Sequence, residues 1–377
     1  MAEVSADRSD IANANRWVVK LGSALLTDDG EGLKPEIVAR IVSMCERLLD
    51  QGKQVVIVSS GAVAAGLAYL SWAERPKKLH DLQAAAAVGQ THLVKAYEIA
   101  FARSGRTTAQ ILLSHDDVLN RDRYLNARNT LNRLLELKVV PIINENDTVA
   151  TDEFRFGDND TLAALVANLI DADAVLLLTD QEGFFTADPR KDDTATLISV
   201  CDVDAQELDS MAGGSGRLGQ GGMQTKLRAA RLAARSATQT IIANGRRPEV
   251  ITEVASGKLV GTWLRANKPS VAARKQWLAG VQKDSGVVTI DAGAVRVIQD
   301  QGRSLLPVGV VAVSGSFRRG DTVLCVGPSG ERIARGLVNL DSQELSLVKG
   351  VSSSRLPELL GYAVDPELIH RDNLVLL

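Results

Sequence analysis

Cysteine and histidine are scarce in this 377-residue sequence, and neither type is clustered. The three cysteines, Cys45, Cys201 and Cys325, lie far apart and form neither a CxxC pair nor a metal-ligand spacing. The four histidines are equally scattered. These absences argue against a disulfide framework and a structural zinc site, so we predict reduced, buried thiols.

Long apolar runs and an excess of positive charge are also missing. No run reaches the roughly 18 apolar residues of a membrane helix, and the opening MAEVSADRSDIANANRW lacks the apolar core of a signal peptide. The net charge is −3, which gives nucleic acid or an anionic membrane no overall attraction. We therefore expect a cytoplasmic globular protein without a membrane partner.

Several common catalytic motifs are absent as well. There is no GxxxxGK[ST] phosphate loop, no HRD and DFG pair, no GxGxxG after the first apolar run and no GxSxG elbow. These absences argue against P-loop enzymes, protein kinases, dinucleotide-dependent enzymes and serine hydrolases of the elbow type.

What the sequence does contain is a repeated alternation of two patterns. Short continuous apolar runs are typical of parallel strands that are buried on both faces, and amphipathic segments with helical spacing separate them. This alternation predicts a three-layer αβα sandwich around a mostly parallel sheet. The apolar runs are residues 17–21, 54–60, 108–113, 139–144, 174–180 and 239–245.

The pattern changes in the last quarter of the chain. From Gly286 the apolar runs are short, rich in valine and glycine, and separated by turns, which predicts a second, smaller and mostly β domain. We expect a flexible N-terminus over residues 1–15, an α/β domain over 16–265, a linker over 266–285 and the β domain over 286–370.

Ligands of open α/β sheets bind at the carboxyl ends of the strands, and the residues there are informative. Lys20 and the adjacent Gly22 follow the first run, where a lysine and an open backbone suit an anion. Small residues from Ser59 to Gly66 begin a helix after the second run and suit an anion as well. Both patterns are also common at purely structural strand ends and helix corners.

Two polar clusters and a glycine-rich segment complete the candidates. The Asn144–Asp147 cluster combines amides and acids, which suit an ammonium group and hydrogen-bonding groups. The Gly157–Asp160 cluster exceeds what a single helix cap requires, although capping explains part of it. Glycines before Lys226 at a helix start resemble a phosphate site, with a flexible linker as the alternative.

Lys20 and Lys226 together favour phosphoryl transfer. This chemistry needs positive charge on the transferred and leaving groups and little covalent catalysis. The residues therefore indicate a kinase of small molecules.

The motifs, taken together, resemble those of the glutamate 5-kinases, within the amino-acid kinase family. The resemblance runs from about Trp17 to Thr262, and SLLPVGVVAVSGSFRRGD in the last part is similar to the PUA domain that many of these enzymes carry. The motifs are VVKLGSALLT, VIVSSGAVAAG, LNARNTL, PIINENDTVAT, GDNDTLAALVA, LLLTDQEGFFTADPR and GGMQTKLRAA.

The resemblance implies the amino-acid kinase fold and ATP-dependent phosphorylation of the γ-carboxylate of L-glutamate. The product is L-glutamyl 5-phosphate, the first intermediate of proline biosynthesis. It further implies Mg²⁺ held by the ATP phosphates and not by protein side chains, feedback inhibition by proline and a homo-oligomer, either dimer or tetramer.

It also implies residue roles. Lys20 and Lys226 neutralise the transferred phosphoryl and the leaving side, while Asp160 positions both lysines. Because the nucleophile is already a carboxylate, no catalytic base is needed. The implied binding positions are Ser60, Asp147 and Asn159 for glutamate, and Lys20, Thr179, Asp180, Gln220, Gly221, Gly222, Met223, Gln224, Thr225 and Lys226 for ATP.

One position departs from the family pattern, and three alternatives remain. Ala24 stands where the family often has a hydroxyl, so a contact from that side chain is lost. Acetylglutamate, aspartate, carbamate and uridylate kinases are disfavoured by the paired INENDTVAT and GDND motifs. An RNA-binding protein is disfavoured because residues 286–377 hold nine basic and ten acidic side chains. A catalytically inactive sensor is disfavoured because both lysines and Asp160 are present.

Overall fold

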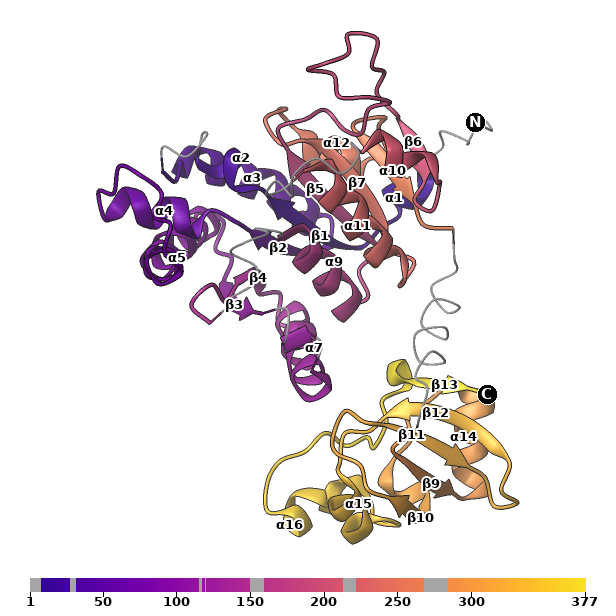
Figure 1. Cartoon of the computed structure of the whole chain (residues 1–377). Helices are drawn as coiled ribbons and strands as arrows, with labels where there is room; N and C mark the ends of the chain where they lie inside the picture. Colours follow the sequence, from indigo (N-terminus) through magenta and orange to yellow (C-terminus); the bar gives the residue numbers. More distant parts are fainter. Residues whose placement is uncertain are drawn as a thin grey trace. The chain divides into compact units, whose positions relative to one another are not determined.

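The computed structural model describes residues 8–27, 32–114, 117–118, 120–149, 159–212, 222–267 and 284–377. The chain divides into two compact units (Figure 1). The first, here the kinase unit, comprises Met1–Val118 and Ala127–Ala273, and the second, here the β unit, comprises Leu119–Asn126 and Arg274–Leu377.

The kinase unit is built on an eight-stranded sheet with the order β3-β4-β2-β1-β5-β7-β8-β6. The strands from β3 to β7 run parallel, β8 runs antiparallel to β7, and β6 pairs parallel to β8. This confirms the mostly parallel sheet. The strands are β1 Arg16–Leu21, β2 Gln54–Ser59, β3 Thr108–Leu113, β4 Val140–Glu145, β5 Ala174–Thr179, β6 Val200–Asp202, β7 Gln239–Asn244 and β8 Thr262–Arg265.

Helices cover both faces of this sheet, which confirms the three layers. Helices α3, α5 and α12 form one layer and share a hydrophobic core with the sheet. Helices α9 and α11 pack against each other in the layer on the opposite face (Figure 1). The helices are α1 Ser9–Ala12, α2 Ser23–Thr27, α3 Pro35–Asp50, α4 Ala62–Tyr69, α5 Leu79–Ala102, α7 Arg121–Glu136, α9 Asn159–Leu169, α10 Glu207–Met211, α11 Met223–Ala234 and α12 Val250–Ala255, and residues 121–126 of α7 belong to the β unit.

The alternation of side chains along β1 decides where its lysine lies. Trp17, Val19 and Leu21 join the core formed with α3, α5 and α12. Successive residues of a strand point to opposite faces, so Lys20 emerges on the other face, where α9 contacts β1.

Helices α4 and α5 approach so closely that only glycine fits at two positions. A Cβ atom on Gly66 would lie 1.7 Å from the Ala85 carbonyl oxygen, and one on Gly89 would lie 1.8 Å from the Ala62 carbonyl oxygen. The two backbones therefore touch directly, and this contact fixes the start of α4 against α5.

The expected flexible N-terminus is not seen for residues 8–15. Ile11 of α1 is fully buried, and the Arg8 guanidinium donates to the carbonyl oxygens of Val260 and Ser199, both at 2.7 Å. Residues 1–7 lie outside the described part of the chain. Arg8 stays in place because several backbone carbonyls satisfy its donors.

The β unit contains a five-stranded sheet with the order β10-β9-β11-β12-β13. Its core includes Phe317, and helices α14, α15 and α16 accompany the strands, so it is less purely β than the sequence indicated. The strands are β9 Gly286–Ile290, β10 Val310–Gly315, β11 Thr322–Val326, β12 Arg332–Leu337 and β13 Leu374–Leu376, and the helices are α14 Ala292–Gln301, α15 Ser342–Val348 and α16 Leu356–Leu360.

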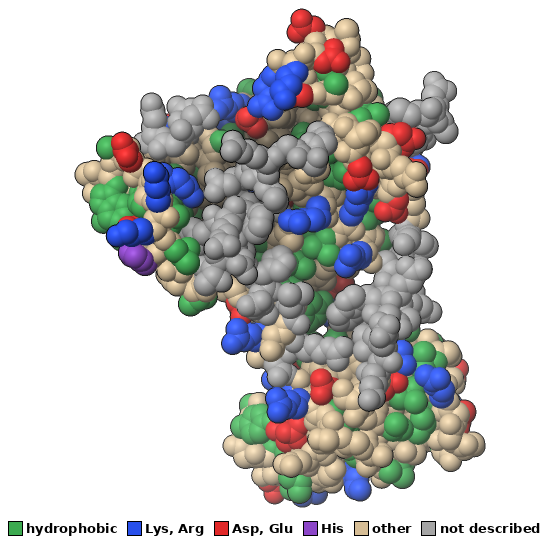
Figure 2. All heavy atoms as spheres, viewed as in Figure 1, with side chains coloured by type: hydrophobic (Ala, Val, Ile, Leu, Met, Phe, Trp, Pro, Cys, Tyr) green, Lys and Arg blue, Asp and Glu red, His purple; other side chains and the backbone are tan. Residues whose placement is uncertain are grey.

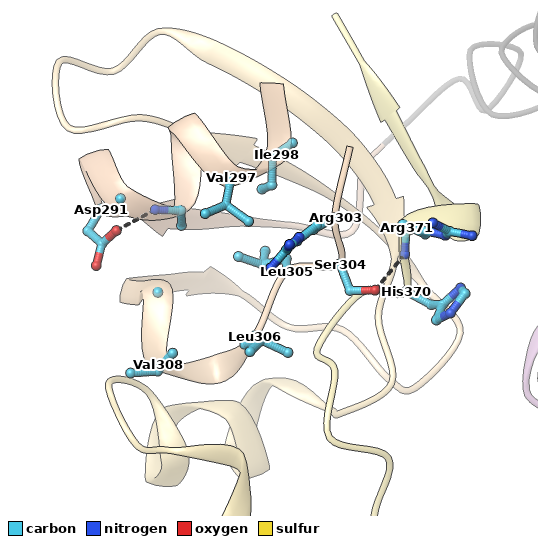
Figure 3. Close-up of a pocket in the computed structure, with 13 residues that line it drawn as sticks. Asp291, Val297, Ile298, Arg303, Ser304, Leu305, Leu306, Val308, His370 and Arg371 are labelled. Carbon is cyan, nitrogen blue, oxygen red and sulfur yellow. Dashed lines mark hydrogen bonds between the residues drawn. The ribbon is translucent and has the colours of Figure 1, made fainter. Parts of the chain in front are cut away.

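A pocket of about 670 Å³ lies within the β unit, between α14 and residues 303–309 (Figure 3). Apolar side chains such as Val297 and Leu305 line most of it. His370 and Arg371 lie at one end, and the Arg371 backbone N–H donates to Ser304 Oγ at 3.0 Å. This pocket is lined by the β unit alone.

Two further expectations concern thiols and the membrane. Cys45 and Cys325 are buried, as predicted, and burial raises the pKa of each thiol to about 12. Cys201 is only half-buried, so the prediction is wrong for this residue. Within the described ranges, no helix is long and apolar enough to cross a membrane.

Candidate active site

The polar residues singled out in the sequence meet at one edge of the kinase unit's sheet. Lys20 lies one residue before the end of β1, paired in register with Val58 of β2 and Leu177 of β5. Strands β2, β4 and β5 end beside it, because all of them are parallel to β1 or to its neighbours. The chain passes from β1 to β2 through α3, but reaches β5 from β4 through α9. A crevice for ligands forms where connections diverge in this way.

A single buried carboxylate joins two lysines at this edge. Asp160 Oδ1 lies 2.5 Å from Lys20 Nζ, and Asp160 Oδ2 lies 2.9 Å from Lys226 Nζ. The exposed fractions of the three side chains are 7% for Lys20, 0% for Asp160 and 5% for Lys226. Thr225 Oγ1 adds a hydrogen bond to Asp160 Oδ2 at 3.1 Å. Three elements far apart in sequence, β1, α9 and α11, thus converge on one carboxyl group.

The two ammonium groups keep this carboxyl group ionised. Burial alone raises the pKa of Asp160, but the charges of Lys20 and Lys226 and their hydrogen bonds outweigh it and lower the pKa to about 2. Two positive charges then share one negative charge in a buried position. Two ammonium groups gathered beside one carboxylate make this a suitable place for an anion.

The start of α11 adds to this anion-binding character. Gly222 at the N-cap has extended backbone angles and provides no side-chain cap. The first backbone N–H groups of a helix lack intrahelical acceptors and carry partial positive charge. Since Lys226 lies in the first turn, a phosphate group at this end meets both the lysine and the helix terminus.

A chain of amide hydrogen bonds lies beside the lysines. Asn159 Nδ2 donates to Ser60 Oγ at 2.9 Å, to the Ser59 carbonyl oxygen at 2.9 Å and to Asn144 Oδ1 at 3.0 Å. Asn144 Nδ2 donates onward to Gln90 Oε1 at 2.7 Å. The side chain of Asn159 therefore connects strand ends and is not used merely to cap α9.

Asn159 and Asp160 are consecutive, so the two clusters are directly linked. One residue belongs to the amide chain at the ends of β2 and β4, and the next binds the two lysines. A ligand bound at the amides consequently lies next to a ligand bound at the lysines. This is the arrangement that group transfer between two bound molecules requires.

The other predicted residues that the structure describes follow strand ends or begin α11. Asp147 is half-buried in the turn after β4. Thr179 Oγ1 donates to the exposed Asp180 carboxylate at 3.0 Å after β5. Met223 is half-buried and Gln224 is exposed in the first turn of α11. Gln220 and Gly221 lie outside the described residues, as does the Gly157–Asp158 part of the second polar cluster.

Comparison with known proteins shows the family of the chain. The model of the amino acid kinase family matches residues 15–244. Glutamate 5-kinase of Chromohalobacter salexigens is 56% identical over 373 residues, which are 99% of this chain and 99% of that protein. Glutamate 5-kinase of Stutzerimonas stutzeri is 56% identical over 371 residues, 98% of this chain and 100% of that protein.

The chain belongs to the amino acid kinase family, among its glutamate 5-kinases.

The β unit has its own match, because the PUA domain model covers residues 286–360. Among solved structures, the UMP kinase of Bacillus anthracis aligns with a TM-score of 0.48 at 16% identity, over 68% of this chain and 97% of that one. That likeness is too weak to bear on function.

Sequence reasoning missed two residues that this kinase unit places behind the site. Gln90 accepts from Asn144, and the Tyr97 hydroxyl lies 3.0 Å from Ser59 Oγ. Both lie on α5, seven residues apart and so on one helical face. Burial raises the pKa of Tyr97, which keeps its hydroxyl neutral. The only signal in the sequence was a polar residue inside an alanine-rich helix, which fits a surface position equally well.

Across the described ranges, no group of three or more His, Cys, Asp or Glu side chains is placed to hold a metal ion. A lysine at a helix start is an arrangement that suits a phosphate group.

Proposed function

We propose that this chain catalyses ATP-dependent phosphorylation of the γ-carboxylate of L-glutamate, giving L-glutamyl 5-phosphate and ADP. A carboxylate oxygen of glutamate bonds to the γ-phosphorus as the bond from that phosphorus to the β,γ-bridging oxygen breaks. This is the first step of proline biosynthesis. The observation that carries the proposal is the buried Lys20–Asp160–Lys226 cluster joined to the amide chain through Asn159.

The two lysines provide the electrostatic part of catalysis. Lys20 neutralises charge on the transferred phosphoryl group, and Lys226 does so on the leaving side. Asp160 holds both ammonium groups in place, which avoids their reorganisation during the reaction. No side chain has to remove a proton, because the γ-carboxylate is ionised at neutral pH.

Glutamate is held at the amide chain. Ser60, which Asn159 contacts at 2.9 Å, binds a carboxylate oxygen together with the start of α4, and Asn159 takes part in the glutamate site by holding Ser60. Asp147 meets the substrate ammonium group, an interaction that its half-buried position after β4 permits. This division places the amino acid at β2 and β4 and the phosphoryl donor at β1, β5 and α11.

ATP is bound by the opposite half of the edge. Thr179 and Asp180 contact the nucleotide, and residues 220–226 with Lys20 hold its phosphates. Mg²⁺ comes with the nucleotide, held by phosphate oxygens, and supplies further neutralisation of their charge.

Further properties belong to this proposal. Proline acts as a feedback inhibitor near the glutamate site, the chain forms a homo-oligomer, and it works in the cytoplasm. The domain ranges of 16–265 and 286–370 stay predictions. Nucleic acid is not the main partner, which is supported by the interspersed basic and acidic side chains on the viewed face of the β unit (Figure 2).

The test is an assay that traps the acyl phosphate. The protein is incubated with ATP, Mg²⁺ and L-glutamate in hydroxylamine, and hydroxamate is measured with and without proline. Aspartate and N-acetylglutamate serve as control acids. Hydroxamate from glutamate alone, suppressed by proline, is the expected result. Turnover only with another acid would retain the kinase chemistry and overturn the substrate.

A further inference from the structure

The orientation of the amide chain is set by backbone groups at both ends. The Glu145 backbone N–H donates to Asn144 at 2.9 Å, so the atom it meets is the oxygen Oδ1. The Ser59 carbonyl oxygen only accepts, so the atom of Asn159 that meets it is the nitrogen Nδ2. An amide has one oxygen and one nitrogen. Asn144 therefore has only its nitrogen left for Gln90, and Gln90 must present its oxygen.

With this assignment, only the oxygen of the Gln90 side-chain amide forms a hydrogen bond. Its Oε1 accepts from Asn144 Nδ2 at 2.7 Å. Its Nε2 has no hydrogen-bond partner within the described part of the chain. The residue is nevertheless buried, with only 8% of its surface exposed. A buried donor without an acceptor is rare and unfavourable. An apolar residue of similar length would avoid this cost, so the hydrogen bond that the oxygen of Gln90 accepts must account for a glutamine at this position.

The chain of amide hydrogen bonds ends at Ser60 and determines whether its hydroxyl group donates or accepts toward a ligand. Ser60 Oγ accepts a hydrogen bond from Asn159 Nδ2. Its hydroxyl hydrogen therefore points elsewhere, and Ser60 faces a ligand as a donor. A donor at this position matches a carboxylate oxygen, which only accepts.

Three residues of helix α5 contact this arrangement. Gly89 lies against the backbone of Ala62 and Tyr97 lies 3.0 Å from Ser59 Oγ, on either side of the segment that carries Ser60. Gln90 lies between these contacts in sequence and fixes the amides. The helix thus sets both the position and the hydrogen-bond polarity of the segment.

We propose that Gln90 is a positioning residue for the substrate carboxylate. Its carbonyl oxygen holds Asn144, Asn144 holds Asn159, and Asn159 holds Ser60 as a hydrogen-bond donor to glutamate. The inference rests on the proposed function, since it concerns the same glutamate site. Gln90 itself does not touch the reacting atoms.

The experiment compares three variants of the full-length chain in the hydroxamate assay. Gln90→Met removes the acceptor while keeping a long side chain, and Gln90→Glu restores an acceptor oxygen. Gln239→Met is the matched control. Gln239 also accepts from two groups, Trp263 Nε1 at 2.9 Å and the Ala266 N–H at 3.0 Å, but it begins β7, at the edge of the sheet opposite the site.

For Gln90→Met we expect the KM for glutamate to rise about tenfold, the size of one lost hydrogen bond in a binding equilibrium. The KM for ATP stays unchanged and kcat changes by less than about threefold, because the lysine cluster remains. Gln90→Glu lies closer to the wild type in KM for glutamate. Gln239→Met lowers Tm without changing either KM.

Other outcomes overturn the inference. An unchanged KM for glutamate in Gln90→Met removes the positioning role while leaving the proposed function intact. Equal increases of both KM values, with a loss of Tm beyond that of Gln239→Met, mean that Gln90 serves packing. The same KM in Gln90→Glu and Gln90→Met shows that the acceptor oxygen is not what matters. A wild-type chain that makes no hydroxamate removes the proposed function first.

Discussion

The two units of this protein differ in what they bury. In the kinase unit the buried polar residues include Lys20, Asp160 and Lys226, whereas the described buried polar residues of the β unit are only Thr322 and Asn373. Ion pairs of the β unit, such as Arg335 with Asp284, keep some exposure on both side chains. Burying charge costs free energy. The difference indicates that the chain accepts this cost where the reaction needs it.

Buried charge in the kinase unit is itself of two kinds. Arg128 pairs with Asp171 at 2.9 Å, and Arg8 is surrounded by carbonyl oxygens. Only at the carboxyl edge do two described lysines share a single carboxylate. Ion pairs such as Arg128 with Asp171 stabilise the fold, whereas two lysines gathered at one carboxylate suit an anionic ligand.

The largest expected effect comes from removing a lysine of the cluster. Lys20→Ala or Lys226→Ala should lower kcat by a factor of about 10² to 10³, the size typical of a lost electrostatic group in an active site. The exposed Lys349 of the β unit supplies the control, because Lys349→Ala should leave kcat unchanged. Circular dichroism checks that the variants are folded. Near wild-type kcat in both lysine variants would sink the assigned roles.

Asp160→Asn should reveal the stabilising part of the same cluster. It removes the negative charge that both buried ammonium groups contact, so we expect a loss of several kcal/mol in unfolding free energy at neutral pH, on the order of other broken buried pairs. The folded pKa of Asp160 is about 2, below the ordinary 3.8. Its contribution is therefore complete above pH 4 and disappears as the pH falls toward 2.

Urea unfolding of both proteins across this pH range measures that contribution. The difference between wild type and Asp160→Asn should be constant above pH 4 and shrink below it. A difference that grows on acidification would contradict the ionised state of Asp160.

Asp147→Ala tests the substrate side of the comparison and should have a smaller effect. Loss of a carboxylate facing an ammonium group should raise the KM for glutamate about tenfold or more, with little change in the KM for ATP. Initial rates at varied glutamate provide the measurement. If the KM for glutamate does not change, Asp147 is not part of the substrate site.

Removal of residues 286–377 should have the smallest effect on the chemistry. The kinase unit and the β unit have separate hydrophobic cores, and all assigned site residues lie in the former. We expect hydroxamate formation to remain detectable in the truncated chain. Total loss of activity in a truncated chain that is folded by circular dichroism would show that the β unit contributes to the reaction.

The elements could be predicted where local sequence decides them. The strand β3 agrees with its apolar run, and β1, β2, β4, β5 and β7 differ from theirs by about one residue. The short β6 and β8 were missed, because three or four residues carry little local preference and their pairing depends on tertiary packing. The buried position of Arg8 was missed, because a polar N-terminal sequence does not indicate that distant backbone carbonyl groups accept its hydrogen bonds.

The site could be predicted only in part. Glycine, lysine and strand position indicated anion binding at Lys20 and Lys226, but the sharing of one carboxylate is a three-dimensional fact. Individual roles came from the resemblance to relatives. Asn159 was open to a capping explanation, and Gln90 gave no signal, since hydrogen bonds between distant side chains leave no periodic pattern in a sequence.

The contact of Gly66 with Gly89 has a consequence for how mutations will be read. Any side chain at either position collides with backbone of the opposite helix, and the displaced α5 carries Gln90 and Tyr97 with it. In a saturation scan scored by growth without proline, both glycines should therefore score like substrate-binding residues. Their intolerance of substitution would reflect the spacing of two helices and not contact with the substrate. An active site mapped from such scores would therefore include residues that the substrate does not contact.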